Sequence, residues 1–308
     1  MSTGQSKVAV ILLTMNQRDK TLRCLNSFEA VHRPKYRIIL WDNGSQDGTV
    51  DAVNREYPNV ITHHHPENIG VASGRNKAAR LAIDQTSPEY LLFMDNDMTV
   101  SPNLLEALVA PFDDTPMLAQ TTGKILDMDD SRRIYGAGGN RIRFWLGDTK
   151  HLGYGEVDRG QYDTPKPCIP SGGCLFVKTK IFQEIGGFDP CFDPYGPEDL
   201  DFGLKVAKAG YSARYVPNAI LYHESKPGRT FEGGLYTEKF AALRVQHWFT
   251  FMKRHASNWE ILGFLLIGIP YLLCSFVVRQ ARRGNLRSSL RVLFRGTFNA
   301  ISKSNLSG

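Results

Sequence analysis

The chain has 308 residues, of which 42% are hydrophobic and 22% are charged. This composition supports a substantial core and argues against wholesale disorder. The formal net charge is +6, yet residues 279–308 alone hold seven basic side chains and no acidic one. The basic character therefore belongs to a C-terminal tail, which indicates an anionic partner such as lipid headgroups or nucleic acid.

The cysteines and the N-terminus narrow the cellular setting. Five cysteines occur without any C-x-x-C pair, which argues against a disulfide framework or a zinc site and fits a reducing cytoplasm. The short apolar run at 8–14 has no basic region before it, so it reads as a buried strand and not as a signal peptide.

Strand-like and helix-like patterns alternate over the first hundred residues. Apolar runs predict strands at 8–14, 37–41, 60–63 and 90–94, and the segments between them predict helices at 19–30, 49–57 and 71–83. Farther on, the pattern predicts a helix at 200–209 and a strand at 216–223. Such alternation predicts an α/β domain with a parallel sheet and helices on both faces, whose ligands bind beyond the carboxyl ends of the strands.

Three polar clusters fall at those strand ends: Thr14-Met15-Asn16, Asp42-Asn43-Gly44 and Asp95-Asn96-Asp97. The carboxylates of Asp95 and Asp97 directly follow a buried strand and suit Mg²⁺ or Mn²⁺, which would neutralise a diphosphate leaving group. A polar turn is the alternative reading. The carboxylate of Asp42 could accept the imide N–H of a uracil or thymine ring.

The ordered set of motifs resembles the family-2 glycosyltransferases over about residues 7–225, and looks closest to their rhamnosyltransferase-like branch. The motifs are the three clusters above, the later pair Glu198-Asp199, and the following set: Gly44 to Thr49, Asn68-Ile69-Gly70, Arg75-Asn76 and His223. The resemblance implies a GT-A fold, which is a Rossmann-like mixed sheet with helices on both faces. It also implies an inverting mechanism and a nucleoside-diphosphate sugar donor.

The resemblance also implies roles for individual residues. Asp199 is the expected catalytic base with Glu198 as its supporting neighbour, and Asp97 is the principal metal ligand, completed by His223. Asp95 serves the ribose or the metal. The remaining expected donor-binding residues are Thr14, Asn16, Asp42, Asn43, Arg75, Asn96, Gly172 and Gly173, with Arg75 near the diphosphate and the two glycines admitting the donor sugar.

Each of these residues also has a purely structural interpretation. Glu198 and Asp199 could be acids favoured by a helix N-terminus, and Arg75 could lie on a solvated helix face. His223 could be a histidine at the edge of the core, and Gly172-Gly173 a bulge or tight turn. The run His63-His64-His65 is predicted to be a solvated strand end, because successive side chains of a strand point to opposite faces.

The C-terminal region changes character. Residues 261–278 carry no charge, and Pro270 with two glycines predicts a bent or re-entrant element, although a transmembrane or a buried core helix is also compatible. We therefore expect a GT-A domain at 1–255, with a nucleotide-sugar half at 7–98 and an acceptor half at 99–255. Residues 256–308 are expected to associate with a membrane through apolar and basic helices.

Together these patterns predict a metal-dependent inverting glycosyltransferase on the cytoplasmic face of the inner membrane, peripheral or monotopic. The expected partners are a UDP- or dTDP-sugar, with rhamnose or another hexose as the sugar, and a glycan or polyprenyl-linked acceptor, with no nucleic acid. Two alternatives are a non-catalytic scaffold that binds sugar nucleotides and a nucleotidyltransferase. The latter class usually has a glycine-rich phosphate loop after the first strand, where this chain has Thr14-Met15-Asn16-Gln17.

Overall fold

The computed structural model describes residues 6–224 and 238–281 and forms two compact units. The first comprises residues up to 141 together with 151–225, and the second comprises 142–150 together with the residues from 226 onward. The second unit therefore includes a short segment from the middle of the chain. The functional boundary expected near residue 255 stays a prediction.

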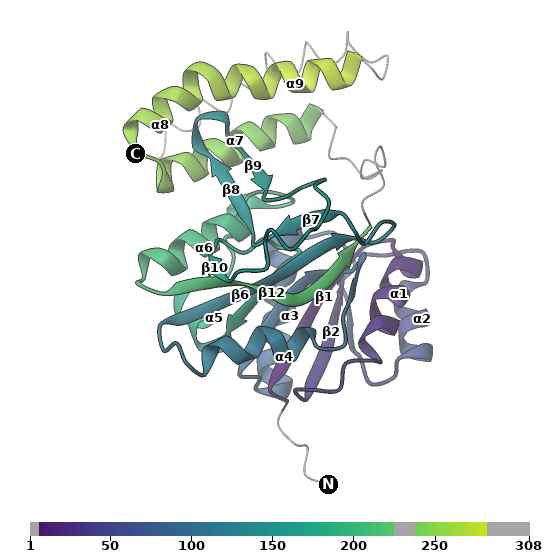
Figure 1. Ribbon diagram of the computed structural model, residues 1–308. Helices are drawn as coiled ribbons and strands as arrows, with labels where there is room; N and C mark the ends of the chain where they lie inside the picture. Colours follow the sequence, from purple (N-terminus) through teal and green to yellow (C-terminus); the bar gives the residue numbers. More distant parts are fainter. Residues whose placement is uncertain (1–5, 225–237, 282–308) are drawn as a thin grey trace. The chain divides into compact units, whose positions relative to one another are not determined.

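The first unit is built on a mixed sheet in the order β10-β12-β6-β11-β4-β1-β2-β3, with β5 paired to β12 and β7 to β6 (Figure 1). Its strands are β1 (Val8–Thr14), β2 (Tyr36–Asp42), β3 (Ile61–His64), β4 (Tyr90–Asp95), β5 (Met98–Val100), β6 (Leu118–Asp127), β7 (Ile134–Ala137), β10 (Lys166–Pro167), β11 (Cys174–Lys178) and β12 (Ser212–His223). Strands β3, β2, β1 and β4 run parallel, whereas β11 is antiparallel to β4 and β6.

Helices cover both faces of this sheet (Figure 1). They are α1 (Arg18–Phe28), α2 (Thr49–Glu56), α3 (Val71–Thr86), α4 (Leu104–Val109), α5 (Thr179–Ile185) and α6 (Glu198–Lys208), with short turns η1 (Ala110–Phe112) and η3 (Pro190–Phe192). The alternation of β1 separates two cores: Val8 and Val10 pack with α1, α2 and α4, and Ala9 and Ile11 pack with α3, α5 and α6. The fold is thus the α/β, GT-A-like mixed sheet that the sequence predicts.

Strands β8 (Asn140–Arg143) and β9 (Asp148–His151) form a separate two-stranded sheet, closed by the turn η2 (Phe144–Leu146). The second unit contains this turn and the helical segments α7 (Glu238–His255), α8 (Asn258–Gly263), η4 (Phe264–Gly268) and α9 (Ile269–Ala281). The segment η4 is a π-helical turn that ends two residues before Pro270, whose nitrogen has no hydrogen to donate within the helix.

One helical stretch among the described residues, Asn258–Ser275, is long and apolar enough to cross a membrane by length and composition. Of its residues, 17% are buried. The uncharged run expected at 261–278 is therefore a helix interrupted by a π-turn. The basic residues from 282 onward lie outside the described residues.

Candidate active site

The carboxyl ends of three neighbouring parallel strands bring the predicted motifs to one edge of the sheet. In the register of β1 and β2, Thr14 is paired with Asp42, and in that of β1 and β4, Leu13 is paired with Asp95. The motifs at 14–16, 42–44 and 95–97 thus meet at this edge because each strand ends at the same level. This is the position at which open α/β sheets bind ligands.

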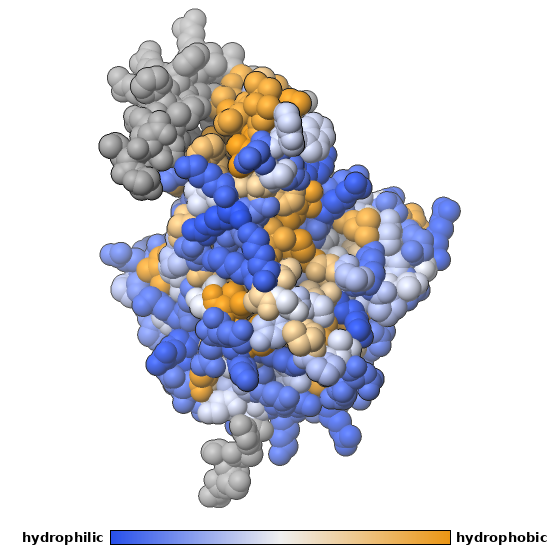
Figure 2. Space-filling view, turned by 90° about the vertical axis from the view of Figure 1, so that its left-hand side faces the viewer, coloured by the Kyte–Doolittle hydropathy of each residue, from blue (hydrophilic) through white to orange (hydrophobic). Residues whose placement is uncertain are grey.

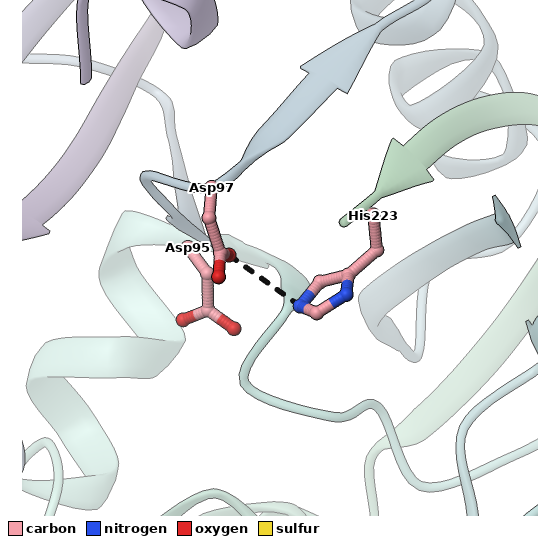
Figure 3. A group of neighbouring side chains, drawn as sticks. All are labelled: Asp95, Asp97 and His223. Carbon is pink, nitrogen blue, oxygen red and sulfur yellow. Dashed lines mark ion pairs between the residues drawn. The ribbon is translucent and has the colours of Figure 1, made fainter. Parts of the chain in front are cut away.

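A second strand pairing brings His223 to the same edge. Strand β5 starts at Met98, which pairs with His223 at the end of β12, so the imidazole lies beside Asp97. His223 Nε2 is 3.4 Å from Asp97 Oδ1 (Figure 3). One ligand atom each from Asp95, Asp97 and His223 lies within 4.8 Å of the others. The Tyr135 ring stacks on His223 with centroids 4.3 Å apart, which restrains the imidazole plane.

The chemistry of this donor set fits a divalent cation. Two carboxylates and one imidazole supply hard oxygen and borderline nitrogen donors, a combination that Mn²⁺ accepts readily and Mg²⁺ accepts through its oxygens. The side chains of Asp97 and His223 are mostly buried, at 14% and 16% exposure, whereas that of Asp95 is 43% exposed. Asp97 and His223 would therefore hold a cation from within the protein, and solvent or a ligand could reach it next to Asp95.

Arg75 is buried in the middle of the site. Its guanidinium donates to Asp95 Oδ1 at 2.9 Å, to Glu198 Oε1 at 3.3 Å and to the Gly172 carbonyl at 3.0 Å. The surface-helix alternative is therefore wrong: Arg75 is 5% exposed and lies on the inner face of α3. The planar fork of the guanidinium joins the β4 edge, the 172 loop and the start of α6, so it positions three parts of the site at once.

The two adjacent glycines differ in what surrounds them. A Cβ on Gly172 would lie 2.6 Å from Arg75 Nη1, whereas one on Gly173 would meet its nearest atom, Asp95 Oδ2, at 3.5 Å. Gly172 is thus required by the close approach of Arg75. That role differs from the approach to a donor sugar expected from the sequence, which stays a prediction for both glycines.

Glu198 and Asp199 open helix α6. Asp199 Oδ2 accepts the Gly172 backbone N–H at 2.6 Å, and Oδ1 accepts that of Leu200 at 2.8 Å. Burial raises the pKa of Asp199 above its ordinary value, against the lowering effect of the Gly172 bond. Burial, together with the charge of Asp199, raises the pKa of Glu198 to about 8, although Arg75 opposes the shift. The pair is therefore more basic than surface carboxylates.

Thr14 and Asn96 form a buried network behind the predicted site. Asn96 Nδ2 donates to Thr14 Oγ1 at 3.1 Å and to Thr21 Oγ1 at 2.9 Å. The two threonine hydroxyls are themselves 3.0 Å apart. Both Thr14 and Asn96 are nearly inaccessible, at 3% and 6% exposure. The network ties α1 to the turn that carries Asp95 and Asp97, so these residues hold the metal-binding turn in place.

The loops after β2 are held by polar contacts. Asp42 is fully buried, and its carboxylate contacts the Ser45 hydroxyl and lies 2.5 Å from His64 Nδ1. Asn16 adopts a left-handed conformation with φ 51°, which asparagine tolerates better than most residues, and its Oδ1 accepts the Gln46 N–H at 2.7 Å. The base-binding role of Asp42 stays a prediction. The structure adds that the Asp42 carboxylate has a histidine partner, His64.

Asn43 serves the neighbouring loop. Its Nδ2 donates to Asn68 Oδ1 at 2.8 Å and to the Gly70 carbonyl at 3.2 Å, so it fixes the segment leading into α3. Asn43 is only 3% exposed, so we expect it to support donor binding through the more exposed residues beside it.

The histidines at the end of β3 do more than the solvated strand end that was predicted. His63 stacks on Trp41 at 4.1 Å, and His64 pairs with Asp42. The side chains diverge, as expected for consecutive strand residues. His64 is the direct register partner of Asp42, a relation that the β2–β3 pairing reveals and that no sequence motif indicated.

Two further residues, Lys20 and His151, lie at the site without any sequence motif to mark them. Lys20 on α1 has its Nζ 3.6 Å from Asp97 Oδ2 and 3.6 Å from Glu224 Oε2. The ring of His151 lies 5.3 Å from that of Tyr135. Burial lowers the pKa of His151, whereas the nearby carboxylate of Asp199 acts in the opposite direction. The site therefore combines carboxylates with one neighbouring ammonium group and two histidines.

Comparison with known proteins places the chain in a family. The model of the family described as Glycosyl transferase family 2 matches residues 9–186. The chain belongs to this family. The matched region includes the strand ends at 14, 42 and 95 but ends before Glu198 and His223.

Two curated relatives indicate the branch. The N-acetylglucosaminyl-diphospho-decaprenol L-rhamnosyltransferase of Mycobacterium tuberculosis is 26% identical over 92% of this chain and 97% of its own length. Galactofuranosyltransferase GlfT2 of Mycolicibacterium smegmatis is 24% identical over 88% of this chain and 45% of its own length. The rhamnosyltransferase likeness extends over nearly the whole of both chains and agrees with the branch that the motifs indicate.

Solved structures share the fold. A structure of GalNAc-T7 with UDP, GalNAc and Mn²⁺ has a TM-score of 0.65 and 16% identity, covering 85% of this chain and 50% of that one. The mannosyltransferase PcManGT from Pyrobaculum calidifontis, in complex with GDP-Man and Mn²⁺, has a TM-score of 0.55 and 20% identity, covering 99% of this chain and 77% of that one. At these identities the likeness concerns the fold.

Proposed function

We propose that the protein is a metal-dependent inverting glycosyltransferase that moves a sugar, with rhamnose favoured, from a nucleoside-diphosphate donor to a polyprenyl-linked glycan. The observation that carries the proposal is the convergence of Asp95, Asp97 and His223 at the carboxyl edge of the sheet. The guanidinium of Arg75 links this cluster to the carboxylate pair at the start of α6, because it donates to both Asp95 and Glu198.

Asp199 is the proposed general base. An acceptor hydroxyl is a weak nucleophile at neutral pH, so a carboxylate must remove its proton as the hydroxyl attacks the anomeric carbon. The two backbone N–H groups that Asp199 accepts fix its orientation, and a carboxylate keeps further lone pairs free for the acceptor proton. Its raised pKa makes it a stronger base than an exposed aspartate. Attack from the face opposite the diphosphate inverts the anomeric centre.

Asp97, Asp95 and His223 are the proposed ligands of Mn²⁺ or Mg²⁺. When bound, the cation supplies positive charge to the diphosphate leaving group. Arg75 balances the negative charge of Asp95 and Glu198, which lets the carboxylates lie close together in a buried site. A direct contact of Arg75 with the diphosphate is part of the proposal and rests on its motif position.

The donor and acceptor follow from separate observations. Asp42 at the end of β2 favours a uracil or thymine base, hence a UDP- or dTDP-sugar. Asn16 and the glycines 172 and 173 would lie beside the donor, and the buried Thr14, Asn43 and Asn96 would support the loops that bind it. The acceptor proposal rests on the mycobacterial relative, whose name specifies a decaprenol-linked sugar. Such an acceptor lies in a membrane, so we place the protein at the cytoplasmic face of the cell membrane, attached through its C-terminal region.

A nucleotide-release assay tests the proposal. Purified protein is incubated with a panel of UDP-, dTDP- and GDP-sugars, with Mn²⁺ or Mg²⁺, with and without chelator, and with defined polyprenyl-diphosphate-linked sugars. We expect release from one donor that depends on both the metal and the acceptor. Binding of one nucleotide without consumption of any donor, across all acceptors, would instead support the scaffold.

A further inference from the structure

The second unit exposes an apolar surface that is unusually rich in large side chains. It consists of the following residues, all between 41% and 82% exposed: Trp145, Trp259, Leu262, Leu265, Leu266, Ile267, Tyr271 and Val278. Apolar side chains gather over this end of the chain in the space-filling view (Figure 2). Clusters of exposed large apolar residues in soluble proteins mark partner or membrane surfaces.

The opposite stripe of the same helical segment is buried. Phe264, Gly268 and Leu272 recur every four residues, and all three are buried. A Cβ on Gly268 would clash with the Trp145 carbonyl oxygen, and one on Gly147 would clash with the Phe264 ring, which shows how closely these groups pack. The middle of the segment is thus fixed on the turn 144–147, and the surface defined above faces away from that contact.

This contact argues against a helix that crosses the bilayer. The window Asn258–Ser275 has residues 264–268 at its middle, so a spanning helix would carry the turn 144–147 to the centre of the hydrocarbon. The turn is flanked by the ion pair of Arg143 and Asp148, with Arg143 Nε 2.7 Å from Asp148 Oδ1. Burying these charges at the bilayer centre costs several kcal/mol. A helix lying in the interface avoids this cost.

The side-chain chemistry fits the interface of an anionic membrane. Trp145, Trp259 and Tyr271 combine an apolar ring with a polar group, which favours the headgroup level. The last turn of α7 holds Lys253, Arg254 and His255, and the seven basic residues of 279–308 follow the apolar surface in the sequence. Basic residues next to such a surface attract anionic lipids.

We propose that the segment 258–281 and the turn 144–147 together form a monotopic lipid-binding surface, which lies in the plane of an anionic phospholipid bilayer and does not cross it. The turn from the middle of the chain is thereby part of the membrane anchor. The proposal deepens the membrane attachment in the proposed function, and it assigns that attachment to named residues outside the catalytic site.

The depth of two tryptophans tests the orientation. Vesicles contain phospholipid brominated either near the headgroup or near the chain ends, and bromine quenches tryptophan fluorescence at its own depth. The variant W259F reports Trp145, W145F reports Trp259, and the double variant W145F/W259F gives the background from the buried Trp41 and Trp248. We expect both tryptophans to be quenched more by the shallow bromines. Stronger quenching of Trp145 by the deep bromines would show a spanning helix and overturn the proposal.

Vesicle binding tests the surface itself. We expect W145E and W259E each to lower partitioning into anionic vesicles on the order of tenfold, because each removes an aromatic side chain from the interface. The variant M117E, in the first unit, changes an equally exposed apolar side chain and should bind like the wild type. Equal melting temperatures show that the variants fold.

Three outcomes contradict the proposal. Wild-type protein that does not bind anionic vesicles excludes the lipid surface, and W145E that binds normally excludes the turn. Wild-type protein that is a dimer in solution and becomes monomeric in W259E would show an interface between two copies of the chain. Vesicle binding requires no sugar donor, so failure of the proposed transferase activity and failure of this inference are distinguishable.

Discussion

Arg75 occupies the space that a side chain on residue 172 would need. Its Nη2 donates to the Gly172 carbonyl at 3.0 Å, and its Nη1 would lie 2.6 Å from a Cβ at that position. Because the same guanidinium holds Asp95 and Glu198, the backbone at 172 and the two carboxylates depend on one another. A change at any of these residues should disturb the others.

A matched pair of glycine variants tests this dependence. We expect G172A to lower the free energy of unfolding by about 1–3 kcal/mol, because the new methyl group displaces a buried guanidinium. The variant G173A should change it little, since its nearest contact would be an ordinary 3.5 Å. Urea unfolding of both proteins gives the comparison. Equal stability of the two variants would show that the Arg75 position is not fixed by Gly172.

The raised pKa of Glu198 predicts a pH-dependent stability. Burial and the charge of Asp199 raise this pKa to about 8, whereas in the unfolded chain it is about 4.3. Between these values the folded protein retains a proton that the unfolded chain has released, so this residue makes the fold less stable as pH rises through that window.

The variant E198Q should remove this effect, because glutamine does not titrate and its amide oxygen can still accept the Arg75 N–H. We expect the free energy of unfolding of E198Q, relative to wild type, to increase from about pH 5 to about pH 8. Urea unfolding at several pH values measures it. The variant E106Q, at an exposed position of α4, is the control for the substitution itself. A flat difference for E198Q would refute the raised pKa.

The predicted metal site can be tested without the enzymatic reaction. We expect D97N and H223N each to weaken Mn²⁺ binding at least on the order of tenfold, since each replaces one of three donor groups with a neutral, weaker amide. Titration calorimetry, or the electron paramagnetic resonance signal of free Mn²⁺, measures the affinity directly. The variant D129N changes an exposed aspartate outside the site and serves as control. Unaltered Mn²⁺ affinity in both site variants would place the metal elsewhere.

His64 should act on donor binding and not on the chemical step. It is the imidazole partner of the buried Asp42, and its loss leaves that carboxylate with one partner fewer, a cost of about 1–3 kcal/mol. We therefore expect H64A to raise the donor KM about tenfold or more, with kcat nearly unchanged. The neighbouring H65A, whose lost imidazole contacts the Glu67 carbonyl and not the Asp42 carboxylate, is the matched variant. A fall in kcat at constant KM would contradict this role.

The sequence predicted the parts of the fold whose patterns are uninterrupted. Strands β1, β2 and β4 are continuous apolar runs that end in polar clusters, and the structure confirms them within one or two residues. Strand β6 was missed, because its buried residues include Gln120, Thr121, Thr122 and Lys124, which break the apolar pattern. Their polar groups are accommodated by contacts that no local pattern shows, such as Thr122 with the Cys174 carbonyl and Lys124 with Asp158.

In the candidate site, too, some residues could be predicted from the sequence and others could not. The i, i+2 spacing after a buried strand indicated Asp95 and Asp97, the family resemblance added His223, and the structure places the three together. The burial of Arg75 between Asp95 and Glu198 could not be read from the sequence, because it joins residues more than a hundred positions apart. Lys20 and His151 have no motif at all, since they reach the site only through the packing of α1 and the end of β9. The chemical roles of all these residues remain predictions.

The most direct test of the central claim compares sugar transfer by wild type and by D199N, with the identified donor, Mn²⁺ and a polyprenyl-diphosphate-linked acceptor. The asparagine retains an oxygen for the Gly172 N–H but cannot take the acceptor proton. We expect kcat to fall by about 10²–10⁴ with the donor dissociation constant unchanged, and D189N to transfer like the wild type. Transfer by D199N at the wild-type rate would contradict the assignment of Asp199 as the base and, with it, the mechanism proposed for this site.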